Sequence, residues 1–163
     1  MLHFEIASSE LDRLALNLAA TDDQARKALR STLNKMAGWL RVQSIKGLSK
    51  SLQIQQKIIR RRLKAVKFKQ TAAGGVAKVW YGLNPVDLIY LGRSVPGGFL
   101  GTGKGGKKQV FKRRGSARLP IDKQSQKILK PAEQALDGGM LSSAAFEAQF
   151  WKTFEHELKW QTR

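Results

Sequence analysis

Hydrophobic residues in the first third of the chain recur at steps of three and four, which is the spacing of one helix face. After residue 22 these positions are Ala25, Ala28, Leu29, Leu33, Met36, Ala37, Leu40 and Ile45. The preceding 21-TDDQ-24 is a capping box, in which Thr21 accepts from a first-turn amide and Gln24 reaches back. The pattern predicts a long helix from Asp22 to Ile45, ended by Gly47. A short amphipathic helix is predicted before it, capped by Ser8 or Ser9 and carrying Leu11, Leu14, Leu16 and Leu18.

The periodicity changes after the long helix. Ser51 can cap a second, shorter helix that carries Ile54, Ile58 and Ile59, with Leu63 near its end. Alternation with period two then predicts strands over residues 65–69, 76–82, 87–92, 108–113 and 117–122, with a turn at Gly74-Gly75. Residues 97–106 hold six glycines and are predicted to be a loop, within the basic segment 96–108.

The C-terminal part returns to a helical pattern. Pro131 suits a first helical position and Gly138-Gly139 a helix end, which predicts a helix over 131–137. Ser142 or Ser143 can cap a final helix, whose apolar positions are Phe146, Phe150, Trp151, Phe154 and Leu158. The predicted fold class is α+β, with N-terminal helices, a small antiparallel β-sheet in the middle and C-terminal helices. Residues 1–163 are predicted to form a single domain that is helical over 1–64, β-rich over 65–122 and helical over 123–163.

Positive charge is concentrated in the middle of the chain. The sequence holds 30 Lys and Arg against 12 Asp and Glu, a formal net charge of +18. Residues 24–121 contain 23 of these cations and one acid, Asp87, whereas the flanks contain 7 cations and 11 acids. Such a region repels itself unless an anionic partner lies against it, and DNA, RNA or an acidic protein surface would serve.

Gly98, Gly103 and Lys104 have the spacing of a phosphate-binding loop. Such a loop also needs a Ser or Thr after the lysine and a helix beyond it. Here Gly105 follows Lys104, and the next residues have the pattern of a strand. The segment is therefore predicted to be the glycine-rich, basic tip of a hairpin.

The sequence shows no pattern of an active site. It has no Cys, and its two histidines, His3 and His156, stand near opposite ends of the chain. Glu155 and Glu157 would point to different sides of one helix, which is poor geometry for an acid–base pair. We therefore expect no enzyme activity, catalytic residue, metal or other cofactor. A signal peptide and a membrane span are not expected either, because the N-terminus lacks a basic start and no apolar run approaches about 18 residues.

Two groups of cations are the candidate contact residues for DNA or a partner protein. The first group is Lys57, Arg60, Arg61, Arg62 and Lys64, continued along the chain by Lys67 and Lys69. The second group is Lys104, Lys107, Lys108, Lys112, Arg113, Arg114 and Arg118. No base-reading motif accompanies them, so only sequence-independent contact with nucleic acid follows.

Three short motifs follow one another in the second half: Pro96-Gly97-Gly98-Phe99, Val110-Phe111-Lys112-Arg113 and Leu119-Pro120-Ile121. A long helix rich in small residues and the basic 57-KIIRRRLKA-65 precede them, and 157-EL-158 follows. In this order and spacing the chain resembles the tailed-phage minor tail protein Z, or tail completion, family. The resemblance covers most of the chain, although each motif is short.

The resemblance implies a structural protein of the virion that completes the head-proximal end of the tail and enables head–tail joining. It implies a homo-oligomeric ring, with a hexamer among the stoichiometries, assembled in the host cytoplasm beside neighbouring tail and head-connector proteins. The basic residues would face genomic DNA, bound non-specifically, or acidic surfaces of those neighbours. The candidate residues of the subunit interface are Phe99, Leu100, Phe150, Trp151, Phe154 and Trp160.

A second hypothesis is a stand-alone, sequence-independent nucleic-acid-binding protein of ribosomal or nucleoid type. Four Trp and an aromatic C-terminal helix favour the assembly protein, because protein partners use such anchors. A basic surface without such aromatic anchors would favour the second hypothesis. A salt titration separates them, since plain DNA binding weakens steeply with salt whereas an apolar contact persists.

Overall fold

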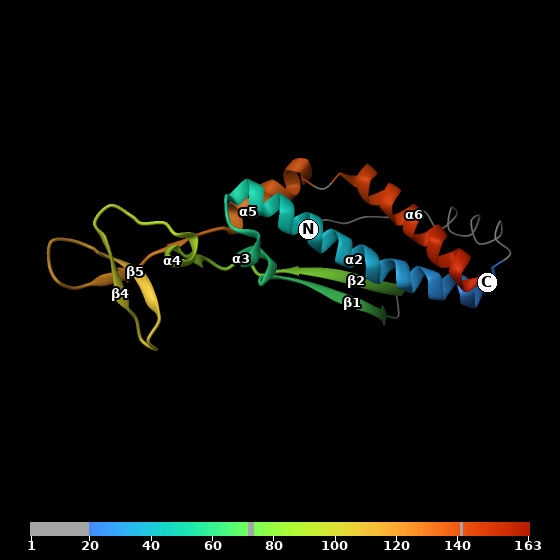
Figure 1. Cartoon of the computed structure of the whole chain (residues 1–163), viewed down its shortest axis with the longest axis horizontal. Helices are drawn as coiled ribbons and strands as arrows, with labels where there is room; N and C mark the ends of the chain where they lie inside the picture. Colours follow the sequence, from blue (N-terminus) through green and yellow to red (C-terminus); the bar gives the residue numbers. More distant parts are fainter. Residues whose placement is uncertain (1–19, 72–73, 141) are drawn as a thin grey trace.

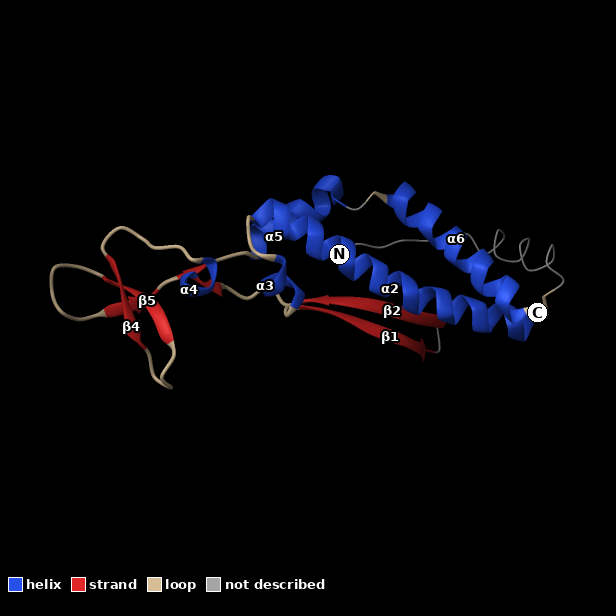
Figure 2. Ribbon diagram, viewed as in Figure 1, coloured by secondary structure: helices blue, strands red, loops and turns tan. Residues whose placement is uncertain are grey.

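The computed structural model describes residues 20–71, 74–140 and 142–163. It is an elongated α+β structure with helices along one part and a small β-sheet at the other end (Figures 1 and 2). The predicted fold class is confirmed. The short helix predicted around Leu11 to Leu18 lies outside the described residues.

The long helix α2 spans Asp22–Leu52 and begins at the predicted capping box. The Thr21 amide donates to Gln24 Oε1 at 2.8 Å, and the Gln24 amide donates to Thr21 Oγ1 at 3.4 Å. The predicted end at Gly47 is wrong, because the helix continues until Gln53 adopts a left-handed conformation with φ 52°. Leu48 and Leu52 are buried, so core packing carries the helix past the glycine.

The C-terminal helix α6 spans Ser143–Gln161 and packs along the first half of α2 (Figure 1). Ser142 caps it as predicted, because its Oγ accepts from the Ala145 amide at 3.0 Å. The core between the two helices contains Ala28, Met36, Phe146, Phe150, Phe154 and Leu158.

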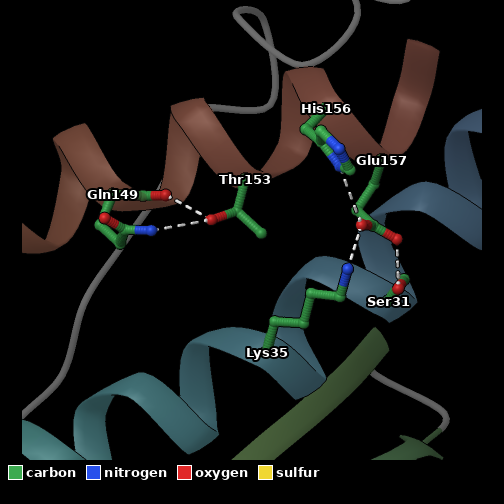
Figure 3. Close-up of polar contacts among 6 residues, drawn as sticks. All are labelled: Ser31, Lys35, Gln149, Thr153, His156 and Glu157. Atoms are coloured by element: carbon green, nitrogen blue, oxygen red, sulfur yellow. Dashed lines mark hydrogen bonds and ion pairs between the residues drawn. The ribbon is translucent and has the colours of Figure 1, made fainter. Parts of the chain in front are cut away.

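One buried carboxylate also joins the two helices (Figure 3). The Glu157 side chain on α6 accepts hydrogen bonds from Lys35 Nζ and, at 2.5 Å, from Ser31 Oγ, both on α2. His156 Nδ1 lies 3.4 Å from Glu157 Oε1. Burial acts to raise the pKa of Glu157, but its hydrogen bonds from Lys35, Ser31 and His156, with the charge of Lys35, outweigh it and lower the pKa below its usual value.

The strands β1 (Leu63–Thr71) and β2 (Gly74–Tyr81) form the predicted antiparallel hairpin. The hairpin lies on α2 on the side away from α6 (Figure 1). Gly74 and Gly75 belong to β2 and pair with Thr71 and Gln70, so the prediction that they form the turn is wrong.

The helix predicted to start at Ser51 is displaced and shorter. Ser51 lies in the last turn of α2, and α3 spans Gln56–Arg60 without a side-chain cap. Leu63 opens β1 and is buried with Ile54 and Ile59 where α2, α3 and α5 meet. This second core contains Ile45, Leu48, Leu52, Ile54, Ile59, Leu63, Val86, Ile128 and Ala132.

The helix α5 spans Leu129–Ala135 and is followed by a π-helical turn, Leu136–Met140. It starts two residues before Pro131, and Gly138 lies inside the π turn, so both predicted ends are displaced. Burial of Ile128 and Ala132 fixes the start of α5 on the second core.

The remaining strands form two small antiparallel sheets. β3 (Val86–Asp87) pairs with β7 (Ser125–Gln126), and β4 (Gly98–Thr102), β5 (Lys108–Arg113) and β6 (Ile121–Lys123) form a three-stranded sheet. β5 is confirmed as predicted. The predicted single middle sheet is thus divided into three, counting the β1–β2 hairpin.

Three predictions in this region need correction. The strand predicted over 87–92 is mostly the short helix α4 (Leu88–Leu91), which ends where Gly92 turns left-handed with φ 62°. The strand predicted over 117–122 begins only at Ile121. Part of the predicted loop 97–106 is strand β4, where Gly101 leaves room for the Phe111 ring, 3.2 Å from the place of a Cβ.

Candidate interaction surfaces

The first group of cations lies at the junction of α3 and β1. Lys57 and Arg60 are on α3, Arg61 ends it, and Lys64 is on β1, all with exposed side chains. Arg62 differs, because its guanidinium donates to the carbonyls of Asn84 at 2.5 Å and Pro85 at 3.2 Å. Arg62 therefore holds the loop after β2 against the start of β1. The other four side chains of this group are exposed and available to contact a partner.

Two further arginines, which the sequence did not identify as candidates, also hold parts of the fold together through hydrogen bonds. Arg41 on α2 donates to the carbonyls of Leu63 at 2.7 Å and Arg60 at 3.0 Å. Arg93 donates to Gln126 Oε1 at 2.6 Å and to the Gln53 carbonyl at 3.1 Å. Part of the positive charge therefore stabilises the fold, since these guanidinium groups satisfy backbone carbonyls.

The second group of cations surrounds the β4–β5–β6 sheet, well apart from the first group along the molecule (Figure 1). All seven side chains are exposed: Lys104, Lys107, Lys108, Lys112, Arg113, Arg114 and Arg118. Arg114 forms a two-point ion pair with Asp122 at 2.7 and 3.0 Å, which lowers the pKa of that carboxyl group. The Arg113 guanidinium lies over the Phe99 ring at 5.7 Å. The remaining cations of the group form no ion pair with a described residue: Lys104, Lys107, Lys108, Lys112 and Arg118.

The tip of this sheet is the glycine-rich segment that has phosphate-loop spacing. Gly105 and Gly106 have φ of 92° and 74°, and the Gly103 amide donates to the Lys107 carbonyl at 3.0 Å. The segment joins β4 to β5, and no helix follows it. It is a hairpin turn, as predicted.

The predicted subunit-interface residues divide between the surface and the core. Phe99, Leu100 and Trp160 are exposed, Leu100 and Trp160 by 67% and 65%. Phe150 and Phe154 are 0% and 1% exposed and stack on each other inside the α2–α6 core. Assigning these two to the surface is therefore wrong for this fold, because α2 covers the apolar stripe of α6. Trp151 is half-buried beside Phe150.

Phe99 and Leu100 also line an open, mostly apolar cleft between α4 and the three-stranded sheet. The cleft is also lined by Ile89 on α4, by Arg93 just after that helix, and by Val110 on β5. Phe99 and Phe111 face each other across β4 and β5 with ring centroids 6.2 Å apart. This end of the molecule thus combines exposed apolar side chains with unpaired cations.

The exposed Trp80 is a surface residue that the sequence analysis missed. It lies on β2 directly opposite Lys64 on β1, and 54% of it is exposed. The strand itself was predicted, and period-two alternation would have placed Trp80 with Lys78 on one face, opposite Tyr81 and Val79. The sequence did not show which of the two faces of the β1–β2 hairpin packs on α2.

Within the described ranges, no three His, Cys, Asp or Glu side chains come together as a metal site would require. No helix in the described part of the chain is long and apolar enough to cross a membrane. No protein-family model, curated protein or solved structure matches the chain.

Proposed function

We propose that this protein is a non-enzymatic structural component of a tailed phage or prophage, which completes the head-proximal end of the tail and enables head–tail joining as a ring of identical subunits. The observation that carries the proposal is the segment 95–121, whose motifs resemble the tail completion family. In the fold this segment supplies β4, β5 and the start of β6, at one end of an elongated molecule (Figure 2).

The surface of this end supports a role in assembly. In a ring of identical subunits, one surface of each subunit must contact a different surface of the next subunit. The exposed Phe99 and Leu100 beside the apolar cleft offer an anchor, and the cations around them offer charge. The exposed acids Glu133, Asp137 and Glu147 on the helical part would complement that charge on the neighbour.

Electron microscopy of lysates from a phage or prophage without this gene tests the proposal. We expect filled heads and full-length tails that do not join, with rescue by the wild-type gene. Rescue by Leu100→Asp should fail, because a charge would replace an exposed apolar anchor without entering the core. Normal infectious particles from the deletion strain would overturn the tail role.

The basic groups are tested in the same complementation. The charges of Arg60 and Arg61 should be reversed and Arg62 left intact, because Arg62 holds the fold through Asn84 and Pro85. If these residues face a partner in the particle, the double variant folds but does not restore joining. Salt resistance of the purified assembly separates an apolar ring contact from the alternative, plain nucleic-acid binding.

A further inference from the structure

The β1–β2 hairpin has one face on α2, and the described side chains on its other face are exposed. Tyr81 and Leu63 form one cross-strand pair, and the Tyr81 hydroxyl hydrogen-bonds Ser44 on α2 at 2.7 Å while Leu63 is buried. Successive side chains of a strand point to opposite faces. The neighbouring pair, Lys64 and Trp80, therefore points away from α2, together with Val66 and Lys78.

The indole of Trp80 lies on this outer face, packed over Gly82. Its Cη2 and Cζ3 atoms lie 2.7 and 2.8 Å from the place where a Cβ on Gly82 would be. The Gly82 amide donates to the Arg62 carbonyl at 2.8 Å, so the glycine continues the hairpin beneath the ring. With 54% of Trp80 exposed, the side of the ring away from the strands is open. An aromatic ring held in this way is a platform on which a base can stack.

The charge around the platform has one sign. Lys64 and Lys78 are exposed, and the chain contains no Asp or Glu between residues 56 and 86. The nearest acid in sequence, Asp87, pairs with Lys123 at 2.9 Å. Neither Lys64 nor Lys78 has an ion pair with a described residue.

We propose that this outer face, defined by Lys64, Lys78 and Trp80, binds single-stranded nucleic acid. A base stacks on the Trp80 indole, and backbone phosphates lie against Lys64 and Lys78. A single strand fits better than a duplex, because paired bases stack on each other and offer no face to the ring. A protein partner fits less well, since the cores of protein interfaces are depleted in Lys and, among the side chains that the structure describes on this face, Val66 alone adds exposed apolar surface beside Trp80. The inference goes beyond the assembly role and does not depend on it.

Fluorescence anisotropy of labelled oligo(dT) with the purified chain tests the proposal. Trp80→Ala should weaken binding by about 5- to 150-fold, the range measured for losing one stacked base. Trp80→Phe should retain part of the affinity, because it keeps a ring. The matched control is Trp160→Ala, which removes another exposed indole, on α6, and should leave binding unchanged.

Two further variants separate ring position from charge. Gly82→Ala keeps the indole but places a Cβ against it and 3.0 Å from the Arg62 carbonyl oxygen. The ring must therefore shift, and the variant should weaken binding while circular dichroism shows an intact fold. The double variant Lys64→Gln and Lys78→Gln should lower both the affinity and its salt dependence. The control is the same change at Lys130 and Lys152, two exposed cations on α5 and α6.

Three results would overturn the inference. One is equal loss of affinity in Trp80→Ala and Trp160→Ala. Another is duplex DNA binding as tightly as oligo(dT), with no effect of Trp80→Ala, which would show that the face attracts charge alone. The third is competition by poly-glutamate as effective as competition by unlabelled oligo(dT), which would indicate an acidic protein segment as the partner.

Discussion

Lys35 on α2 and Glu157 on α6 form an ion pair although 122 residues separate them in the sequence. The carboxylate is the buried member, with 7% of its side chain exposed against 55% for Lys35. Since Glu157 also accepts from Ser31, one side chain joins two helices that otherwise share an apolar core and a hydrogen bond from Gln24 Nε2 to the Gln161 carbonyl at 2.9 Å. This relationship makes the packing of α6 on α2 dependent on the charge of one residue.

The first prediction concerns the pH dependence of that packing. The pKa of Glu157 is lowered in the folded protein, so its contribution to the free energy of unfolding is full above the ordinary value of 4.5 and is lost as the pH falls through the lowered pKa. Glu157→Gln should lower the free energy of unfolding by about 1–3 kcal/mol at neutral pH. Urea denaturation across pH should show this difference shrinking as the pH falls below 4.5.

Glu155→Gln is the matched control for this experiment. Glu155 pairs with Lys159 on the exposed side of α6, at 2.6 Å with 49% of its side chain exposed. Exposed pairs of this kind contribute less than about 1 kcal/mol, so the variant should unfold almost like the wild type. A Glu157→Gln difference that stayed constant with pH would contradict the assigned role.

The second prediction compares two aromatic residues on α6. Phe150 is fully buried and Trp160 is 65% exposed. Phe150→Ala should lower the free energy of unfolding by about 3–5 kcal/mol, because it leaves a cavity between α2 and α6. Trp160→Ala should change it by less than about 0.5 kcal/mol. Urea midpoints of the isolated chain provide the test, and equal effects would mean that Phe150 is not a core residue.

The elements that the sequence predicted best were those with a local signal. The capping box at Thr21, the Ser142 cap and the alternation of β5 each depend on neighbours in the sequence, and all three are confirmed. The predicted helix end at Gly47 was wrong because distant packing decided it. Leu48 and Leu52 meet Ile128 and Ala132 in one core, and no local pattern reveals that contact.

The candidate surfaces were predictable in composition but not in exposure. The sequence identified the cations, yet Arg62 and Arg114 turned out to have partners within the chain. Phe150 and Phe154 have the pattern of an aromatic stripe that could cover a partner or a core. Deciding between the two required knowing that α6 lies on α2, which is a contact across more than 100 residues.

The third prediction separates structural arginines from exposed ones. Arg62→Ala removes two charged hydrogen bonds to the carbonyls of Asn84 and Pro85, and should lower the free energy of unfolding by about 1–2 kcal/mol. Arg61→Ala should leave it within about 0.5 kcal/mol, because the exposed Arg61 side chain has no partner among the described residues. Chemical denaturation of both variants is the measurement. Identical stability would mean that the Arg62 contacts contribute nothing in solution.

The fourth prediction is a stabilising change in α2. Gly38 is inside this helix, and a Cβ added there would meet no atom within 4 Å. Because glycine loses more backbone entropy in a helix than alanine does, Gly38→Ala should raise the free energy of unfolding by about 0.5–1 kcal/mol. The melting temperature followed by circular dichroism at 222 nm, a helix signal, should therefore rise by a few degrees.

Gly98→Ala is the opposing control for the fourth prediction, because the same chemical change meets a different environment. A Cβ at Gly98 would lie 2.9 Å from the Val95 carbonyl oxygen and 2.8 Å from Val95 Cγ2, so the backbone at the start of β4 must shift. This variant should lower the melting temperature while Gly38→Ala raises it. A melting temperature below that of the wild type for both variants would contradict the prediction for Gly38→Ala. The space beside Gly38 would then be filled in solution, because α2 would pack there against a surface other than those described.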